Sequence, residues 1–171
     1  MDVRLGNYFI ISKKTEYPAF DISKSHDVRK FQEKVFIPLG QSLYLLPKTF
    51  ALGVTLEYLR LPRCLCCEVV TRSTWGRLGL IIATAVWVHP MFTGCLTLEL
   101  VNAGDLPIAL FPGMKVGTLV FHTVEGDVET GHKGVRKYMG SVLPEFSHVK
   151  SESEQLARLK EIGIKFYPAK K

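Results

Sequence analysis

The chain has 171 residues, of which 47% are hydrophobic and 22% charged, and its formal net charge is +6. This length and composition fit one globular domain with a sizeable core and exclude an intrinsically disordered chain. The basic residues are scattered rather than gathered in one long run, which argues against a nucleic-acid partner and favours a small anionic ligand.

Nothing in the chain predicts contact with a membrane. The longest nearly uncharged run, residues 78–88, is too short to span a bilayer, and residues 1–11 lack the pattern of a signal peptide. We therefore expect a cytoplasmic protein. No linker, repeat or low-complexity tract interrupts the chain, so we expect a single domain over residues 1–171.

Short apolar or alternating runs, separated by proline and glycine, predict a strand-rich sandwich or barrel. The expected strands cover residues 3–12, 35–39, 42–46, 50–59, 66–71, 80–88, 95–101, 106–111 and 115–122. Short helices are expected at 25–33, 72–79 and 151–162, and a glycine-rich, charged loop at 125–140.

The cysteines raise the question of a metal or redox site, because Cys64 and Cys67 form a CxxC motif. The sequence has no second CxxC and no histidine pair at ligand spacing, and the motif lies in an expected strand. We therefore expect the cysteines to be small buried hydrophobic residues and expect no zinc site.

Residues 72–80 (RSTWGRLGL) combine arginines with hydroxyl side chains. If they form a helical turn, Ser73 and Arg77 share a face. With Arg72 and Thr74, such a turn could bind an anion. The alternative is a helix cap beside a surface arginine, and these residues taken alone favour that alternative.

Glu99 is the only acidic residue between Gly79 and Gly104. Alternation in the expected strand 95–101 places Glu99 on one face and three leucines on the other. A carboxylate there is either exposed or buried with a partner, and a buried carboxylate beside an arginine can act as a general base.

Several segments together resemble the dCTP deaminase family, which belongs to the dUTPase superfamily. They are DVRLG at residues 2–6, ALGVTLEYLRLP at 51–62, RSTWGRLGL at 72–80, residues 84–121 and RKYMG at 136–140. The resemblance implies an all-β fold, a distorted β-barrel of the dUTPase-like (β-clip) type with short peripheral helices. It also implies a homotrimer with active sites between subunits.

The resemblance implies hydrolytic deamination of dCTP to dUTP and ammonia. Glu99 matches the catalytic carboxylate, and Ser73 and Arg77 match residues that reach the pyrimidine of a nucleotide held mainly by a neighbouring chain. The H-x-E and P-C-x-x-C motifs of zinc deaminases are missing, so Glu99 would act without a metal, and Mg²⁺ would enter on the nucleotide triphosphate. The residues expected to bind substrate are Arg72 and Thr74 at the phosphates, Thr84 and Ala85 at the base edge, His89, Phe92, and Lys137 and Tyr138 in the closing segment.

Some positions depart from the family pattern. His89 stands where many members have an aspartate that holds the sugar 3′-hydroxyl, Met91 stands where glycine is usual, and the glutamine of the closing tail is missing near Ser141. Two alternatives stay open. One is a dUTP pyrophosphatase or bifunctional deaminase, which the similarity of residues 141–144 to archaeal bifunctional members favours. The other is a non-catalytic nucleotide-binding homologue.

Overall fold

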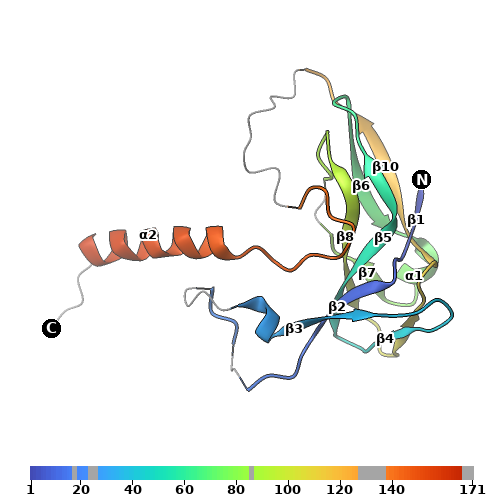
Figure 1. Ribbon diagram of the computed structural model, residues 1–171, viewed down its shortest axis with the longest axis horizontal. Helices are drawn as coiled ribbons and strands as arrows, with labels where there is room; N and C mark the ends of the chain where they lie inside the picture. The colour runs from blue at the N-terminus through green and yellow to red at the C-terminus, as the bar shows by residue number, and fades with distance from the viewer. Residues whose placement is uncertain (17–18, 23–26, 85–86, 127–137, 167–171) are drawn as a thin grey trace. The chain divides into compact units, whose positions relative to one another are not determined.

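The computed structural model describes residues 1–16, 19–22, 27–84, 87–126 and 138–166 (Figure 1). The expected site residues Ala85 and Lys137 lie outside this part of the chain. The chain divides into two compact units, the first made of Met1–Ser12 and Lys34–Glu145 and the second of Lys13–Glu33 and Phe146–Lys171. Among the described helices, none has the length and apolarity needed to cross a membrane.

The first unit is built almost entirely of strands, as the turn-separated apolar runs predict. Within the described residues these strands form three sheets, with the orders β1-β10-β6, β3-β2-β5-β8-β7 and β4-β9. The strands are β1 Asp2–Arg4, β2 Tyr8–Ser12, β3 Gln32–Phe36, β4 Leu43–Leu45, β5 Phe50–Arg60, β6 Leu65–Thr71, β7 Leu80–Ile82, β8 Thr93–Asn102, β9 Ile108–Leu110 and β10 Lys115–Thr123.

The three sheets share one hydrophobic core, to which β1, β2 and β4 to β10 all contribute side chains. Sheets that close around a common core form a barrel, and here it is distorted because the strands are short and fall into separate sheets. The largest fully buried side chains include Phe9, Leu98, Leu100, Leu110 and Leu119. The expected all-β barrel is therefore confirmed, but not the expectation that every helix is short, because α2, Lys150–Phe166, has 17 residues.

The central strand β8 shows how the sequence specifies its own orientation. It lies between β5 and β7, and its leucines Leu96, Leu98 and Leu100 are buried. Thr97 and Glu99, which alternate with them, are half-buried. Successive side chains of a strand point to opposite faces, so the alternation fixes which face packs on the core.

Several expected elements differ from the structure. The strand expected at 3–12 is divided into β1 and β2, and the strand expected at 35–39 is β3, which ends at Phe36. The strand expected at 80–88 ends at Ile82, and Val88 makes only an isolated bridge to Cys67. The helix expected at 25–33 is a short 3₁₀ turn, η2 Val28–Lys30, because the chain enters β3 at Gln32. The helix expected at 151–162 is longer, as α2 covers Lys150–Phe166. At residues 32–33, pairing of β3 with β2 overrides the local helical pattern.

The second unit contains η2 and α2. Asp27 caps η2 by accepting a hydrogen bond from the backbone N–H of Arg29. The guanidinium of Arg29 lies 5.8 Å from the ring centre of Phe146, and the rings of Phe20 and Phe31 meet edge to face.

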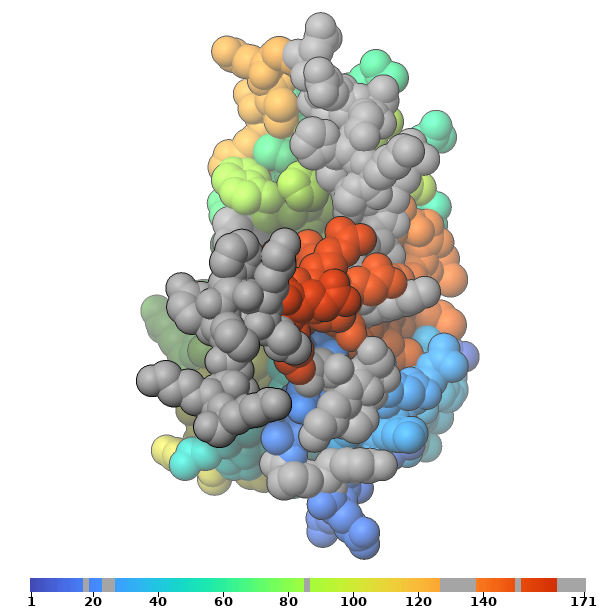
Figure 2. All heavy atoms as spheres, turned by 90° about the vertical axis from the view of Figure 1, so that its left-hand side faces the viewer, coloured from blue at the N-terminus to red at the C-terminus, as the bar shows by residue number. Residues whose placement is uncertain are grey.

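In the first unit, the hydrogen-bond register of β6 and β10 brings Leu65 opposite Thr123, far from β1. This end of β10, coloured amber, lies at the top of both views (Figures 1 and 2). The opposite end of the same sheet, where β1 joins it, carries the polar contacts described next.

Candidate active site

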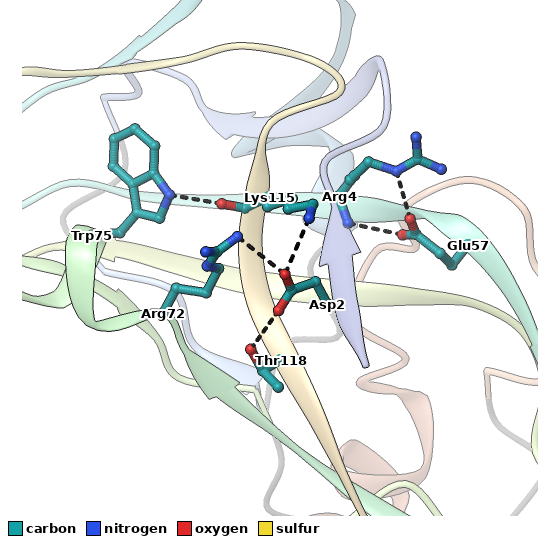
Figure 3. A network of polar contacts seen from close by, with 7 residues as sticks. All are labelled: Asp2, Arg4, Glu57, Arg72, Trp75, Lys115 and Thr118. Carbon is teal, nitrogen blue, oxygen red and sulfur yellow. Dashed lines mark hydrogen bonds and ion pairs between the residues drawn. The ribbon is translucent and has the colours of Figure 1, made fainter.

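The 72–80 segment is anchored at its start to two strands. The backbone N–H of Arg72 donates to the carbonyl of Val116, and the indole N–H of Trp75 donates to the carbonyl of Lys115, at 2.7 Å. The guanidinium Nη1 of Arg72 donates to a carboxylate oxygen of Asp2 at 3.2 Å (Figure 3). These contacts hold the start of the segment against β1 and β10.

The end of the segment is anchored by a close approach of two backbones. Gly79 has a φ of +92°, and a Cβ added there would lie 2.5 Å from the amide nitrogen of Gly104. Only glycine therefore fits this position. The buried side chain of Asn102 completes the anchor, since its amide donates to the carbonyls of Leu45 and Leu106 and its oxygen accepts from the N–H of Gly104.

Between these anchors the segment presents its polar side chains to solvent. Helix α1, Ser73–Gly76, forms the expected helical turn, and the N–H of Arg77 bonds to the carbonyl of Ser73 at 3.0 Å. Ser73, Thr74 and Arg77 are exposed. A short polar segment fixed at both ends gives a rigid support for binding residues.

Glu99 lies on the central strand β8, opposite Leu52 of β5. Its side chain is half-buried, and burial raises the pKa of its carboxyl above the ordinary value. A carboxylate in such surroundings accepts a proton more readily than one in water, which suits a general base. The sequence left open whether Glu99 is exposed or buried, and in the structure it is partly buried.

Thr84 lies beside Glu99, although 15 residues separate them in sequence. The Thr84 hydroxyl oxygen accepts a hydrogen bond from the Glu99 backbone N–H at 2.9 Å, and the N–H of Ala83 donates to the Glu99 carbonyl. The chain after β7 therefore runs along β8 and brings these two expected site residues together.

A second group of expected site residues lies at the start of β8. Phe92, which packs against the core, closes a turn in which its N–H donates to the carbonyl of His89. The N–H of Gly140, just after Tyr138, donates to the carbonyl of Thr93. His89 and Tyr138 are exposed. From Thr93 to Glu99 the strand extends for roughly 20 Å, so this group and Glu99 occupy different parts of β8.

The turn before β8 also explains one departure from the family pattern. Met91 follows Pro90 within the turn from His89 to Phe92, and its φ is +66°. Proline followed by a residue of positive φ defines a type II turn, in which glycine is preferred at the second position. The positive φ at this turn position explains why glycine is usual in the family, and Met91 adopts the same left-handed backbone conformation although it is not glycine.

The expected site residues thus fall into three groups within one chain: the 72–80 segment, Glu99 with Thr84, and the start of β8. Among the residues that the structure describes, no hydrogen bond or ion pair joins Arg77 to Glu99. The two residues are brought onto one compact unit but are not paired within it.

The sequence patterns did not single out Asp2 or Asn102. Asp2 lies in the DVRLG motif, yet its partners Arg72 and Thr118 are 70 and 116 residues away. The one sequence feature that could have marked Asn102 is that it is a polar residue at the end of a buried strand. For Asp2, the sequence offers no such feature beyond its motif.

The cysteines differ in burial, and Cys66 is only half-buried. Cys67 and Cys95 are buried as expected, and burial raises the pKa of the Cys67 thiol to about 11, which keeps it protonated at neutral pH. Cys64 is exposed, so for this residue the expectation of burial was wrong, because it lies in the turn before β6. In the described part of the chain, no three histidine, cysteine, aspartate or glutamate side chains gather as a metal site would require.

The fold and these residues define a β-barrel protein with a half-buried carboxylate on a central strand and an anchored segment of exposed arginine and hydroxyl side chains. The family description "dCTP deaminase-like" matches residues 1–124. The chain belongs to this dCTP deaminase-like family.

Known relatives agree with this assignment. A Methanobrevibacter smithii protein named "dCTP deaminase, dUMP-forming" is 39% identical over 158 residues, which cover 90% of this chain and 81% of the relative. A Sulfurihydrogenibium protein of the same name is 37% identical over 82% of this chain and 75% of its own. A Halorubrum lacusprofundi protein named "dCTP deaminase" is 34% identical over 90% of this chain and 77% of its own.

A solved structure supports the fold. The crystal structure of 2′-deoxycytidine 5′-triphosphate deaminase from Agrobacterium tumefaciens matches with a TM-score of 0.59 and 21% identity. The match covers 71% of this chain and 40% of the Agrobacterium chain, so this chain spans less than half of that protein's length.

Proposed function

We propose that this chain is a hydrolase that deaminates dCTP and releases dUMP as its final nucleotide. The half-buried Glu99 carboxyl on β8 carries the proposal, because it supplies a base where the family resemblance requires one. The final product differs from the dUTP that the sequence led us to expect. Relatives up to 39% identical to this chain are named dUMP-forming, which favours dUMP.

In the deamination step, Glu99 takes a proton from water as the water oxygen bonds to C4 of cytosine. The same proton passes to N3 of the ring, and a second transfer lets ammonia leave as the C4–N bond breaks. One water is consumed, so dCTP becomes dUTP and ammonia. The raised pKa that burial gives the Glu99 carboxyl strengthens it as a base.

Ser73 and Arg77 would act on a nucleotide bound mainly to another copy of the chain. Within one chain, Arg77 and Glu99 are not paired, and the Ser73 and Thr74 side chains of α1 are exposed rather than packed in the barrel core. A site shared between copies in a homotrimer would let the Arg77 guanidinium keep the Glu99 carboxyl ionised. Ser73 would orient the water and the base.

The remaining expected residues would bind the nucleotide. Arg72 and Thr74 contact phosphates in this proposal, and Mg²⁺ enters as part of the triphosphate substrate. Thr84 lies beside Glu99, where it can help to hold the base edge. Ala85, Phe92, Lys137 and Tyr138 keep the roles that the resemblance implies.

The second hydrolysis, from dUTP to dUMP and pyrophosphate, needs a group that activates water at the α-phosphate. His89 stands where many members have an aspartate, it is exposed at the turn before β8, and we propose it as this group. A neutral imidazole can accept the same proton. A His89→Gln variant should therefore release ammonia from dCTP but stop at dUTP.

The proposal is tested by incubating the protein with dCTP and, separately, with dUTP, each with Mg²⁺, while following ammonia, pyrophosphate and both uridine nucleotides. Equal amounts of ammonia, pyrophosphate and dUMP are expected. Ammonia with dUTP alone would refute the second hydrolysis but keep the deaminase. Pyrophosphate from dUTP without ammonia from dCTP would identify a dUTP pyrophosphatase, and binding without either product would identify a non-catalytic homologue.

A further inference from the structure

Two cationic side chains and one hydroxyl converge on the carboxylate of Asp2 (Figure 3). Arg72 Nη1 lies 3.2 Å and Lys115 Nζ lies 3.3 Å from the same oxygen, Oδ2. The Thr118 hydroxyl donates to the other oxygen, Oδ1, at 3.0 Å. These residues come from β1, β10 and the chain just after β6, so only the folded barrel assembles them.

Asp2 is ionised at neutral pH in this arrangement. The hydrogen bonds from Thr118 and Lys115 and the charge of Arg72 lower the pKa of its carboxyl, against a smaller opposing effect of burial. One carboxylate charge then faces two cations. The cluster therefore keeps an excess of positive charge at the start of the 72–80 segment, which also carries Ser73 and Thr74.

Asp2 orients Arg72 without consuming its capacity to bind an anion. A guanidinium carries five N–H donors in a planar fork. Among contacts between described residues, the Arg72 guanidinium uses Nη1 alone, on Asp2, and 35% of the side chain remains exposed. The backbone of Arg72 is fixed as well, by its bond to Val116.

We propose that Asp2 is a positioning residue that holds Arg72 and Lys115 ready for the phosphates of the nucleotide, and that Lys115 is a second phosphate-binding cation. This inference rests on the proposed function for the nature of the ligand. Holding both side chains in place before binding removes an entropic cost that binding would otherwise carry.

The opposite role for Asp2 predicts an effect of opposite sign. If Asp2 were only a counter-ion that competes with phosphate, its neutralisation would strengthen nucleotide binding, because the local positive charge would rise. If Asp2 positions the cations, its neutralisation weakens binding despite that rise in charge. The direction of the change therefore separates the two roles.

The experiment measures the dissociation constant of dCTP with Mg²⁺ by calorimetry, together with kcat and KM. Asp2→Asn should weaken dCTP binding about tenfold, the size of one charge-assisted hydrogen bond, and change kcat much less. Binding of deoxycytidine, which has no phosphate, should not change. Asp105→Asn, at an exposed turn residue outside the network, is the matched control for the change in charge.

A double-mutant cycle tests whether Asp2 acts through Arg72. Adding Asp2→Asn to Arg72→Gln should lose less affinity than Asp2→Asn does alone, because only the effect through Lys115 remains, whereas a purely structural role would add its full effect. Lys115→Met should weaken binding of dCTP but not of deoxycytidine, and it decides the proposal if Asp2→Asn does not fold. The inference is overturned if Asp2→Asn binds dCTP as tightly as the parent or more tightly. If Asp2→Asn does not fold, the same result for Lys115→Met overturns it.

The outcome for the parent protein keeps the two proposals apart. A parent that deaminates dCTP while Asp2→Asn binds it normally refutes only the positioning role. A parent that binds dCTP without turnover refutes the proposed function, and the dissociation constants still decide the role of Asp2. A parent that does not bind dCTP refutes both.

Discussion

Replacing Asn102 with aspartate should destabilise the barrel far more than its small change in volume suggests. Asn102 is fully buried, and its amide nitrogen donates two hydrogen bonds of 2.8 Å, to the carbonyls of Leu45 and Leu106. Aspartate cannot make either donation when ionised. One buried and one partly buried carbonyl would then face a carboxylate oxygen instead of a donor.

The magnitude follows from those two contacts. Each buried polar group left without a partner costs about 1–3 kcal/mol, so the loss of unfolding free energy at pH 7 should be about 3 kcal/mol or more. The surroundings also raise the pKa of the new carboxyl, because two carbonyl dipoles and burial disfavour its charge. As the pH falls through that raised pKa, the group becomes neutral and regains one donor, so the loss should shrink.

The assay is urea unfolding at one fixed protein concentration, followed by tryptophan fluorescence at pH 7 and at about pH 4.5, a value between the ordinary aspartate pKa and neutrality. Asn7→Asp is the matched control, since Asn7 is only partly buried and donates one bond, to the carbonyl of Ile37. Its loss should be well under half as large. A loss below about 1 kcal/mol for Asn102→Asp, or an equal loss at both pH values, would refute the reasoning.

Three further predictions concern the site. Glu99→Gln should lower the deamination rate by about 10²–10⁴-fold. It should not lower the thermal unfolding midpoint at pH 7, because burial disfavours the charged carboxyl of Glu99, and a lower midpoint would contradict this. Arg77→Gln should move the acid limb of the pH profile of kcat/KM to higher pH, because the Arg77 charge would no longer oppose the effect of burial on the Glu99 pKa. An acid limb at the same pH would exclude the pairing of Arg77 with Glu99. Met91→Gly should raise the unfolding midpoint, because it removes about 1–2 kcal/mol of left-handed backbone strain, more than the conformational entropy that glycine adds to the unfolded chain. A lower midpoint in calorimetry would refute this.

The sequence determined the strand-rich fold and much of its order. Turn residues and alternation are local signals, and they correctly placed most of the ten strands described here, with β5, β8 and β10 close to their observed bounds. The burial of the β8 leucines opposite a half-buried Glu99 follows from the two-residue period of a strand. The helical turn at residues 72–79 was also predicted from its residues alone.

Only the tertiary structure decided which distant groups meet. The contact of Thr84 with the Glu99 backbone and the convergence of Arg72, Lys115 and Thr118 on Asp2 depend on strand register. Register arises from packing of the whole core, so no local pattern encodes these pairs. For the same reason β7 ends at Ile82 rather than continuing through its apolar run, and the left-handed conformation of Met91 became visible only in the folded turn.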